Sequence, residues 1–104
     1  MIEIINLKYE QPSKQYDFRI DRYTILGNIF PMSGEHNRNM VCNQFEEHFK
    51  NLILKDDWKD SDVYYLLNKM VNIYKKYGKL RLFCWCAPKR CHGITYRKYI
   101  EGEL

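Results

Sequence analysis

The sequence predicts a small three-layer α/β domain with a mainly parallel sheet. Two observations lead to this class. Residues 80–86 are almost entirely apolar, which is typical of a strand buried on both faces of such a sheet. Two segments with helical spacing precede this strand, and a short β-branched run opens the chain at residues 2–7. The 104 residues fit a single domain that spans residues 1–104.

The other strand-like segments are less uniform. Residues 2–7, with three isoleucines, form the expected first strand, and Pro12 lies in the loop after it. Residues 16–21 alternate apolar and charged side chains, which predicts a half-exposed strand at a sheet edge. Residues 24–26 then either extend the sheet or form a tight connection before an irregular loop at residues 29–37.

Three helices are expected. Apolar residues recur at helical spacing over residues 38–54 and again over residues 63–77. The pair Asp60-Ser61 offers two suitable N-caps for the second of these helices, and Gly78 fits the position just past its end. A last helix is expected over residues 95–100, with its aromatic side chains directed inward.

Composition and charge limit the classes of partner. The formal net charge of +4 favours anionic partners in general. Charges of both signs are interspersed, however, so a nucleic-acid partner is not expected. No apolar run approaches the length of a membrane span, and the first residues lack the basic start of a signal peptide. We therefore expect no membrane partner, a cytoplasmic location and four cysteines in the reduced state.

Residues 87–93 form a short loop between the buried strand and the last helix. The loop holds one proline, two adjacent cations and a Cys-His-Gly run. Unpaired N–H groups at a helix amino end, together with two cations, favour an anion such as a phosphate. Ligands of parallel sheets bind beyond the carboxyl ends of the strands, so the end of the first strand is expected at the same rim.

A nucleotide-like or other phosphorylated small molecule would suit this rim. Asp17, Asp21 and Arg22 are candidates for contacts with ribose hydroxyls or a base edge, and Asn28 for an amide contact. Trp85 or Tyr23 is a candidate for stacking on a base. No cofactor is expected. The predicted ligand-binding residues are Asn6, Lys8, Asp17, Arg22, Asn28, Cys86, Ala87, Pro88, Lys89, Arg90, Cys91, His92 and Gly93.

The same loop leaves three other interpretations open. Cys91 could be the nucleophile, with His92 or His36 as base, of a nucleotide-processing hydrolase or glycosyl-transfer enzyme, because a thiol at a helix amino end beside cations ionises easily. The chain could instead be a zinc-stabilised interaction module, although the ligand spacing is not that of a common zinc site. Its ligands would be Cys84, Cys86, Cys91 and His92. Finally, the two cations of the loop could simply be solvated.

Residues 84–93 read Cys-Trp-Cys-Ala-Pro-Lys-Arg-Cys-His-Gly. In its Cys-Trp-Cys-Ala-Pro-x-x-Cys-His-Gly pattern the chain resembles a family of small proteins of unknown function, which is frequent in tailed-phage genomes and also occurs in bacteria. The resemblance covers nearly the whole chain. The other matching segments are Asn6-Leu7-Lys8, Tyr16-Asp17, Ile20-Asp21-Arg22-Tyr23-Thr24, Leu26-Gly27-Asn28, Arg38 and Cys42.

This family is distantly similar to Rossmann-like nucleotide-binding folds, so the resemblance implies a Rossmann-like domain with a nucleotide-type ligand. Two positions depart from the family pattern, since Ile29 replaces a proline and Ile94 replaces an acidic residue. If that acidic residue is catalytic in relatives, its loss favours binding without turnover. The protein would then be a phage sponge for a host-defence nucleotide signal. Burial of a charged ligand and the many aromatic residues also favour a homodimer.

Overall fold

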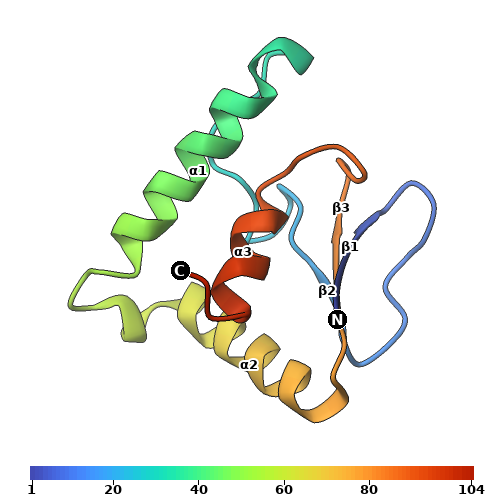
Figure 1. Ribbon diagram of the computed structural model, residues 1–104, viewed down its shortest axis with the longest axis vertical. Coiled ribbons are helices and arrows are strands. Elements are labelled where there is room, and N and C mark those ends of the chain that lie inside the picture. Colours follow the sequence, from blue (N-terminus) through green and yellow to red (C-terminus); the bar gives the residue numbers. More distant parts are fainter.

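A parallel sheet of three strands forms the centre of the computed structural model, which describes residues 1–104 (Figure 1). The strands β1 (Ile2–Asn6) and β2 (Asp17–Arg19) lie on either side of β3 (Leu80–Cys84). β1 pairs with β3 along its whole length, and the three residues of β2 pair with the middle of β3. Because all pairings are parallel, the carboxyl ends of the three strands meet at one edge of the sheet.

Three helices accompany the sheet: α1 (Arg38–Leu52), α2 (Asp62–Tyr77) and α3 (Gly93–Ile100). Short 3-10 helices at Glu35–Asn37 and Trp58–Asp60 precede α1 and α2. In Figure 1 all three helices lie on one side of the sheet, and the connection between β1 and β2 runs along the other side. None of the helices is both long enough and apolar enough to cross a membrane.

Capping residues set both ends of α2. Ser61 is the N-cap, and its Oγ accepts a hydrogen bond from the N–H of Tyr64 over 3.1 Å. Gly78 follows the helix in the left-handed conformation, with φ at 67°, which glycine adopts without steric cost. The capping positions predicted from the sequence are therefore confirmed.

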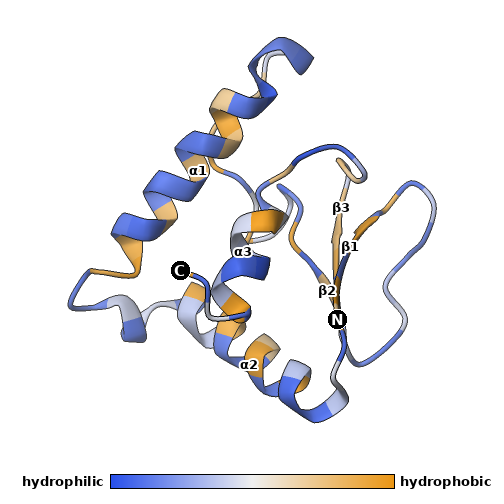
Figure 2. Ribbon diagram, in the orientation of Figure 1, coloured by the Kyte–Doolittle hydropathy of each residue, from blue (hydrophilic) through white to orange (hydrophobic).

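The main core lies between the sheet and the helices. Leu80, Leu82 and Cys84 contribute one face of β3 to it, and all three are almost fully buried. Aromatic rings fill the space beyond: the ring of Phe49 lies edge-on to those of Trp58 and Tyr96, with centroids 5.8 and 5.4 Å apart. Figure 2 shows hydrophobic positions recurring between hydrophilic ones along α1 and α2, as expected for helices with one face in this core.

The opposite face of β3 is also covered. Phe83 points to this face and is fully buried. The guanidinium carbon of Arg81 lies 5.2 Å from the centroid of the Phe83 ring and 5.9 Å from that of Tyr16. The connection between β1 and β2, which supplies Tyr16, thus takes the place of a helical layer.

The structure confirms the α/β class and the parallel sheet, but it does not confirm the three-layer, Rossmann-like arrangement, since the helices share one side (Figure 1). β2 covers three of the six residues expected, and residues 24–26 form a turn rather than extending the sheet. β3 ends two residues earlier than expected, before a bend at Trp85. α3 begins at Gly93, also two residues early.

Candidate functional site

A cavity of about 210 Å³ opens at the carboxyl ends of the strands; we name it the rim pocket. Its walls come from the loop after β2, the first turns of α1 and the segment after β3. This edge is where parallel sheets ordinarily bind ligands. The lining residues are Asp21, Arg22, Tyr23, Asn28, Met32, Arg38, Val41, Cys42, Cys84, Trp85, Cys86, Arg90, Cys91 and His92.

Asp21 supplies a buried carboxylate to the wall of the rim pocket. Arg19 donates to it through Nε over 3.0 Å and Nη2 over 2.6 Å, and the indole Nε1 of Trp85 donates over 3.2 Å. Burial opposes ionisation of Asp21, but the hydrogen bonds from Arg19 and Trp85 hold its pKa below the usual value. The pocket therefore contains a charged acceptor at neutral pH.

The loop after β2 is folded back on itself by Arg22 and Gly27. The Arg22 guanidinium donates to the backbone carbonyls of Asn28 and Phe30, the latter over 2.8 Å. Gly27 packs so closely that a Cβ there would lie 2.6 Å from the Cα of Arg22. Asn28 is buried, and its Oδ1 accepts from the N–H of Phe30 over 2.9 Å. Arg22 and Asn28 thus line the pocket, and their side chains are hydrogen-bonded to the backbone of the loop that forms its wall.

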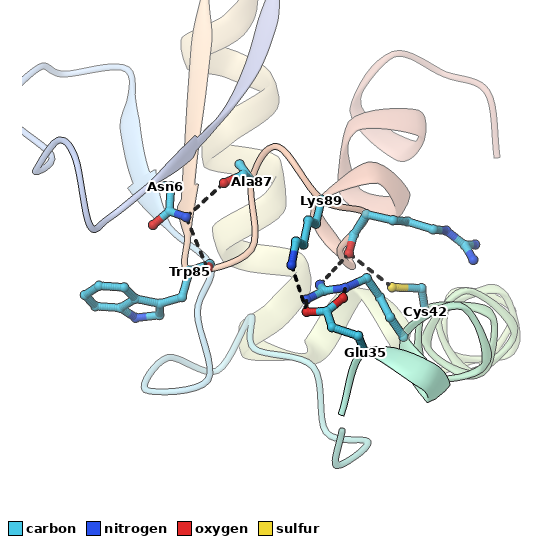
Figure 3. A network of polar contacts seen from close by, with 8 residues as sticks. Asn6, Glu35, Cys42, Trp85, Ala87 and Lys89 are labelled. Atoms are coloured by element: carbon cyan, nitrogen blue, oxygen red, sulfur yellow. Dashed lines mark hydrogen bonds and ion pairs between the residues drawn. The ribbon is translucent and has the colours of Figure 1, made fainter. Parts of the chain in front are cut away.

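Asn6, at the end of β1, anchors the segment after β3. Its Nδ2 donates to the carbonyl of Ala87 over 2.8 Å and to that of Trp85 over 3.3 Å (Figure 3). Its Oδ1 accepts from the backbone N–H of Lys8 over 2.8 Å. The amide of Asn6 therefore fixes the bend that carries Trp85 and Cys86 to the rim.

A second cavity of about 300 Å³, which we name the outer hollow, adjoins the rim pocket. Arg38, Trp85 and Cys86 line both cavities, so a ligand group in one is close to the other. The outer hollow is lined by Asn6, Lys8, Tyr9, Glu35, Arg38, Trp85, Cys86, Ala87, Pro88 and Lys89.

Arg38 is the central cation of the two cavities, and its side chain is only 12% exposed. It donates to both carboxylate oxygens of Glu35, over 2.9 and 2.7 Å, and to the backbone carbonyl of Arg90 over 2.9 Å. The Lys89 Nζ donates over 3.2 Å to Glu35 Oε1, the oxygen that also accepts from Nη2 of Arg38 (Figure 3). The hydrogen bonds from Arg38 and Lys89 lower the pKa of Glu35 to about 2. An arginine and a lysine therefore converge on one acidic group at the cavity wall.

The cation Arg90 turns away from Glu35. Its guanidinium donates to the backbone and side-chain oxygens of Asn39 and to Oδ1 of Asn43, at distances of 2.8 to 3.3 Å. Both asparagines belong to α1, so Arg90 ties the segment after β3 to that helix. The two adjacent cations of the loop thus have different roles, and neither is merely solvated.

Three thiols gather where the rim pocket meets the bend after β3. The Sγ atoms of Cys84 and Cys91 lie 3.6 Å apart, and both residues are buried. Cys86 is partly exposed and lines both cavities. The neighbouring Cys84 and Cys91 thiols, followed by the Arg38 guanidinium, lower the pKa of Cys86, and burial opposes them only in part. Contact with Cys86 raises the pKa of Cys84, and contacts with Cys84 and then Cys86 raise that of Cys91.

The surroundings of Cys91 and His92 do not favour the catalytic pair considered above. Contacts with the other thiols and burial raise the pKa of Cys91, which disfavours a thiolate there. His92 is buried, and its Nε2 lies 2.6 Å from the carbonyl oxygen of Ile20, to which it donates. Burial lowers the pKa of His92. No three histidine, cysteine or acidic side chains are placed to hold a metal ion in the structure, and the zinc interpretation stays a prediction.

The predicted ligand-binding residues fall into three groups. Arg22, Asn28, Cys86, Arg90, Cys91 and His92 line the rim pocket. Asn6, Lys8, Cys86, Ala87, Pro88 and Lys89 line the outer hollow. Asp17 and Gly93 line neither cavity. Asp17 lies at the amino end of β2, bonded to Arg81, and Gly93 is packed against Ile20 and Cys91 at the start of α3.

Arg38 and Cys42 are the main lining residues that the prediction left out. They lie one turn apart on α1, and both contact the backbone carbonyl of Arg90, Arg38 over 2.9 Å and Cys42 over 3.7 Å. Their four-residue spacing on a predicted helix was visible in the sequence and places them on the same helical face. Nothing in the sequence indicates that this face meets the segment after β3.

Comparison with protein families matches residues 5–102 to a domain of unknown function, DUF4326. The match agrees with the expectation that the chain belongs to a family of unknown function. That the Cys-Trp-Cys-Ala-Pro-x-x-Cys-His-Gly pattern marks this family, and that the family is related to Rossmann-like folds, stay predictions. Neither the curated proteins nor the solved structures gave a match.

Proposed function

We propose a function for this chain, which belongs to the DUF4326 family of domains of unknown function: it binds a nucleotide-like anionic small molecule across the rim pocket and the outer hollow. The base would occupy the rim pocket, and the phosphate groups would lie toward Arg38 and Lys89. The rim pocket and the outer hollow, of about 210 and 300 Å³, share Arg38 and Trp85, which suits one ligand with two chemically distinct ends.

The convergence of Arg38 and Lys89 on the Glu35 carboxylate is the observation that carries this proposal. Two cations that already share a carboxylate oxygen are arranged for an oxyanion. The Glu35 side chain is 59% exposed and lies on a short 3-10 helix, so it can turn into solvent when a phosphate takes its place. Arg38 itself is mostly buried and held by the Arg90 carbonyl, which keeps the guanidinium in position.

The other walls suit a base and a sugar. Trp85 is about half exposed beside the rim pocket, and Tyr23 is almost fully exposed at the same cavity. Each offers an aromatic face on which a base can stack. The charged carboxylate of Asp21 lies in the same wall and is a suitable acceptor for ribose hydroxyls.

Retention rather than turnover is the proposed outcome of binding. The buried Cys91 and the His92 ring bonded to Ile20 are poorly placed for the chemistry considered for them. A protein that holds a nucleotide signal without cleaving it lowers the free concentration of that signal, as a phage-encoded sponge in the host cytoplasm would. We also propose a homodimer, since Tyr23, Ile25 and Ile29 leave large apolar side chains exposed on the loop that borders the rim pocket.

Native mass spectrometry tests these proposals together. The protein is incubated with a mixture of mono-, di- and cyclic nucleotides, and its mass is measured before and after denaturation. We expect a dimer that carries one class of nucleotide and releases it chemically unchanged. Recovery of an altered nucleotide would support the enzyme instead, and a strictly monomeric protein would exclude the homodimer.

A matched pair of arginine variants places the ligand. Arg38→Gln removes the central cation, whereas Arg97→Gln makes the same charge change on α3, outside both cavities. We expect Arg38→Gln to weaken binding of ADP by roughly tenfold or more, since charge-assisted hydrogen bonds contribute about 1.5–3 kcal/mol. Arg97→Gln should leave it within about twofold. Equal losses of ADP affinity in the two variants, both of them folded, would show that the ligand binds outside the two cavities.

A further inference from the structure

We propose that Cys84 and Cys91 form a modification site: hydroperoxides convert their two thiols into a disulfide that locks the bend after β3. This inference does not depend on the proposed nucleotide. It rests on the contact between the two Sγ atoms, 3.6 Å apart, and on the hydrogen bonds that hold both residues in place.

The pair stands apart from the other two free cysteines. Its sulfur atoms are in contact with each other, and both side chains are almost fully buried. Cys42 instead contacts the carbonyl oxygen of Arg90 over 3.7 Å, and Cys86 is partly exposed. An S–S bond is about 2.05 Å long, so the two sulfur atoms of the pair need to approach by only about 1.5 Å.

The sheet fixes the position of Cys84. This residue ends β3, and in the parallel pairing it lies beside Asn6 of β1. Its carbonyl oxygen accepts a hydrogen bond from the N–H of Leu7 over 2.7 Å. The backbone that carries the first sulfur is therefore held at the carboxyl edge of the sheet.

Cys91 is held from both sides along the chain. The preceding carbonyl, of Arg90, accepts from Arg38 over 2.9 Å, and the carbonyl of Cys91 accepts from the N–H of Ile94 over 3.2 Å. The N–H of Gly93 donates to the Cys91 sulfur over 3.3 Å. The second sulfur is thus fixed at the start of α3, and two thiols held in contact react with each other far more readily than separate molecules do.

The rim pocket gives access to the pair. Cys84 and Cys91 both line this cavity, so a small oxidant that enters it reaches their sulfur atoms. The two side chains are only 1% and 4% exposed, which excludes larger molecules. Hydrogen peroxide and small organic hydroperoxides therefore suit the site.

The chemistry balances with a hydroperoxide as the only co-reactant. One thiol attacks a peroxide oxygen, so that an S–O bond forms, the O–O bond breaks and the departing alkoxide takes up the thiol proton. The sulfur is oxidised by two electrons to a sulfenic acid, and the peroxide is reduced to an alcohol. The second thiol then attacks this sulfur, an S–S bond forms, and the hydroxyl leaves as water with the second thiol proton.

The bond encloses residues 85–90, which contribute to the walls of both cavities. It joins the end of β3 covalently to the start of α3. A cross-link of this kind restrains the unfolded chain, so the oxidised protein is more stable than the reduced one.

Peptide mapping locates the bond without any substitution. The native protein is treated with hydrogen peroxide, its remaining thiols are blocked, and it is digested with trypsin and chymotrypsin together. Cleavage then places Cys84, Cys86 and Cys91 on three different peptides. The cleavage sites that separate them are Phe83, Trp85, Lys89 and Arg90.

We expect the peptides of Cys84 and Cys91 to be joined and to separate on treatment with dithiothreitol. A peptide of Cys86 joined to that of Cys91, or no joined peptide at all, would overturn the assignment.

Thermal unfolding of matched variants tests the lock. We expect peroxide to raise the unfolding temperature of the wild type by at least about 5 °C, and dithiothreitol to reverse the increase. Cys86→Ala keeps the pair and should behave like the wild type, whereas Cys84→Ala removes one sulfur and should show no increase. The same increase in Cys84→Ala, or none in a wild type that carries the bond, would contradict the proposal.

Discussion

Arg81 holds the Asp17 carboxylate with two parallel hydrogen bonds, Nε to Oδ1 over 2.7 Å and Nη2 to Oδ2 over 2.9 Å. The side chains are 11% and 0% exposed, and they join the central strand to its edge strand. The backbone N–H groups of Ser13 and Lys14 also donate to Oδ2, each over 2.8 Å. Asp17, which the sequence suggested as a ligand-binding residue, therefore has a complete set of partners within the fold.

This ion pair makes stability depend on acid pH. Burial by itself would raise the pKa of Asp17, but the hydrogen bonds from Arg81, Ser13 and Lys14 lower it from 3.8 to about 2. A carboxyl with a lowered pKa stabilises the fold fully above about pH 4, and this contribution is lost as the pH falls toward 2. We expect the loss to be about 2 kcal/mol in urea titrations between pH 5 and 2.

The variant Asp17→Asn tests the origin of that dependence. It should lower the free energy of unfolding by roughly 2–3 kcal/mol at pH 7, because the buried guanidinium loses its charged partner. Its stability should also change less between pH 5 and 2. Glu3→Gln is the control, since it removes the exposed pair with Lys79 and should cost less than about 1 kcal/mol. If the wild type and Asp17→Asn lose the same stability between pH 5 and 2, other carboxyl groups cause the pH dependence.

Glu35 should compete with an anionic ligand. Glu35→Gln removes the internal carboxylate from Arg38 and Lys89 and leaves both cations available. We expect calorimetry to show that inorganic pyrophosphate and ADP bind roughly two- to fivefold more tightly, the range of an exposed ion pair. Glu47→Gln makes the same charge change on an exposed position of α1 outside both cavities and should have no such effect. Weaker binding in Glu35→Gln would show that the carboxylate helps to bind the ligand.

Trp85 should report base stacking. It is about half exposed beside the rim pocket, whereas Trp58, the other tryptophan, is buried in the core. In a Trp58→Phe background we expect ADP to quench the remaining fluorescence and pyrophosphate to leave it nearly unchanged. Trp85→Leu should weaken ADP roughly tenfold, because a stacked base contributes about 1–3 kcal/mol, and should leave pyrophosphate unaffected. Equal losses for both probes would mean that Trp85 only shapes the cavity.

Gly27 should be intolerant of a side chain. An alanine Cβ would lie 2.6 Å from the Cα of Arg22 and 2.7 Å from the carbonyl oxygen of Asp21, and these backbone atoms cannot turn aside. We expect Gly27→Ala to lower the free energy of unfolding by about 1–3 kcal/mol through this overlap. Gly34→Ala is the matched control, because its Cβ would meet only the ring of His36, at 3.0 Å. Chemical denaturation measures the free energy of unfolding of the two variants. Equal values for Gly27→Ala and Gly34→Ala would contradict the prediction.

The helices could be predicted from the sequence because their buried positions repeat. Phe45 and Phe49 recur at helical spacing and face one core, so the predicted and observed ends of α1 and α2 agree within two residues. The end of β3 could not be predicted in this way. Trp85 continues the apolar run, yet it is about half exposed, and its indole N–H is bonded to Asp21. Hydrophobicity does not distinguish an aromatic residue at a rim from one in a core.

The site could be predicted only where it is contiguous in sequence. Arg90, Cys91 and His92 line the rim pocket because they follow the central strand directly. Arg38 comes from a helix 52 positions away from Arg90, and its role depends on how α1 meets that segment. The partner of Asp17, Arg81, likewise lies 64 positions further along the chain. Pairings at such separations arise from tertiary packing and leave no local periodic signal.

The place of β3 in the sheet also affects how the chain is made. β3 is synthesised after both of its neighbours, and these two strands do not pair with each other. Until β3 has left the ribosome, β1 and β2 are exposed without hydrogen-bonding partners. The sheet must therefore assemble in one late step. The nascent polypeptide is therefore most prone to aggregate just before its central strand leaves the exit tunnel.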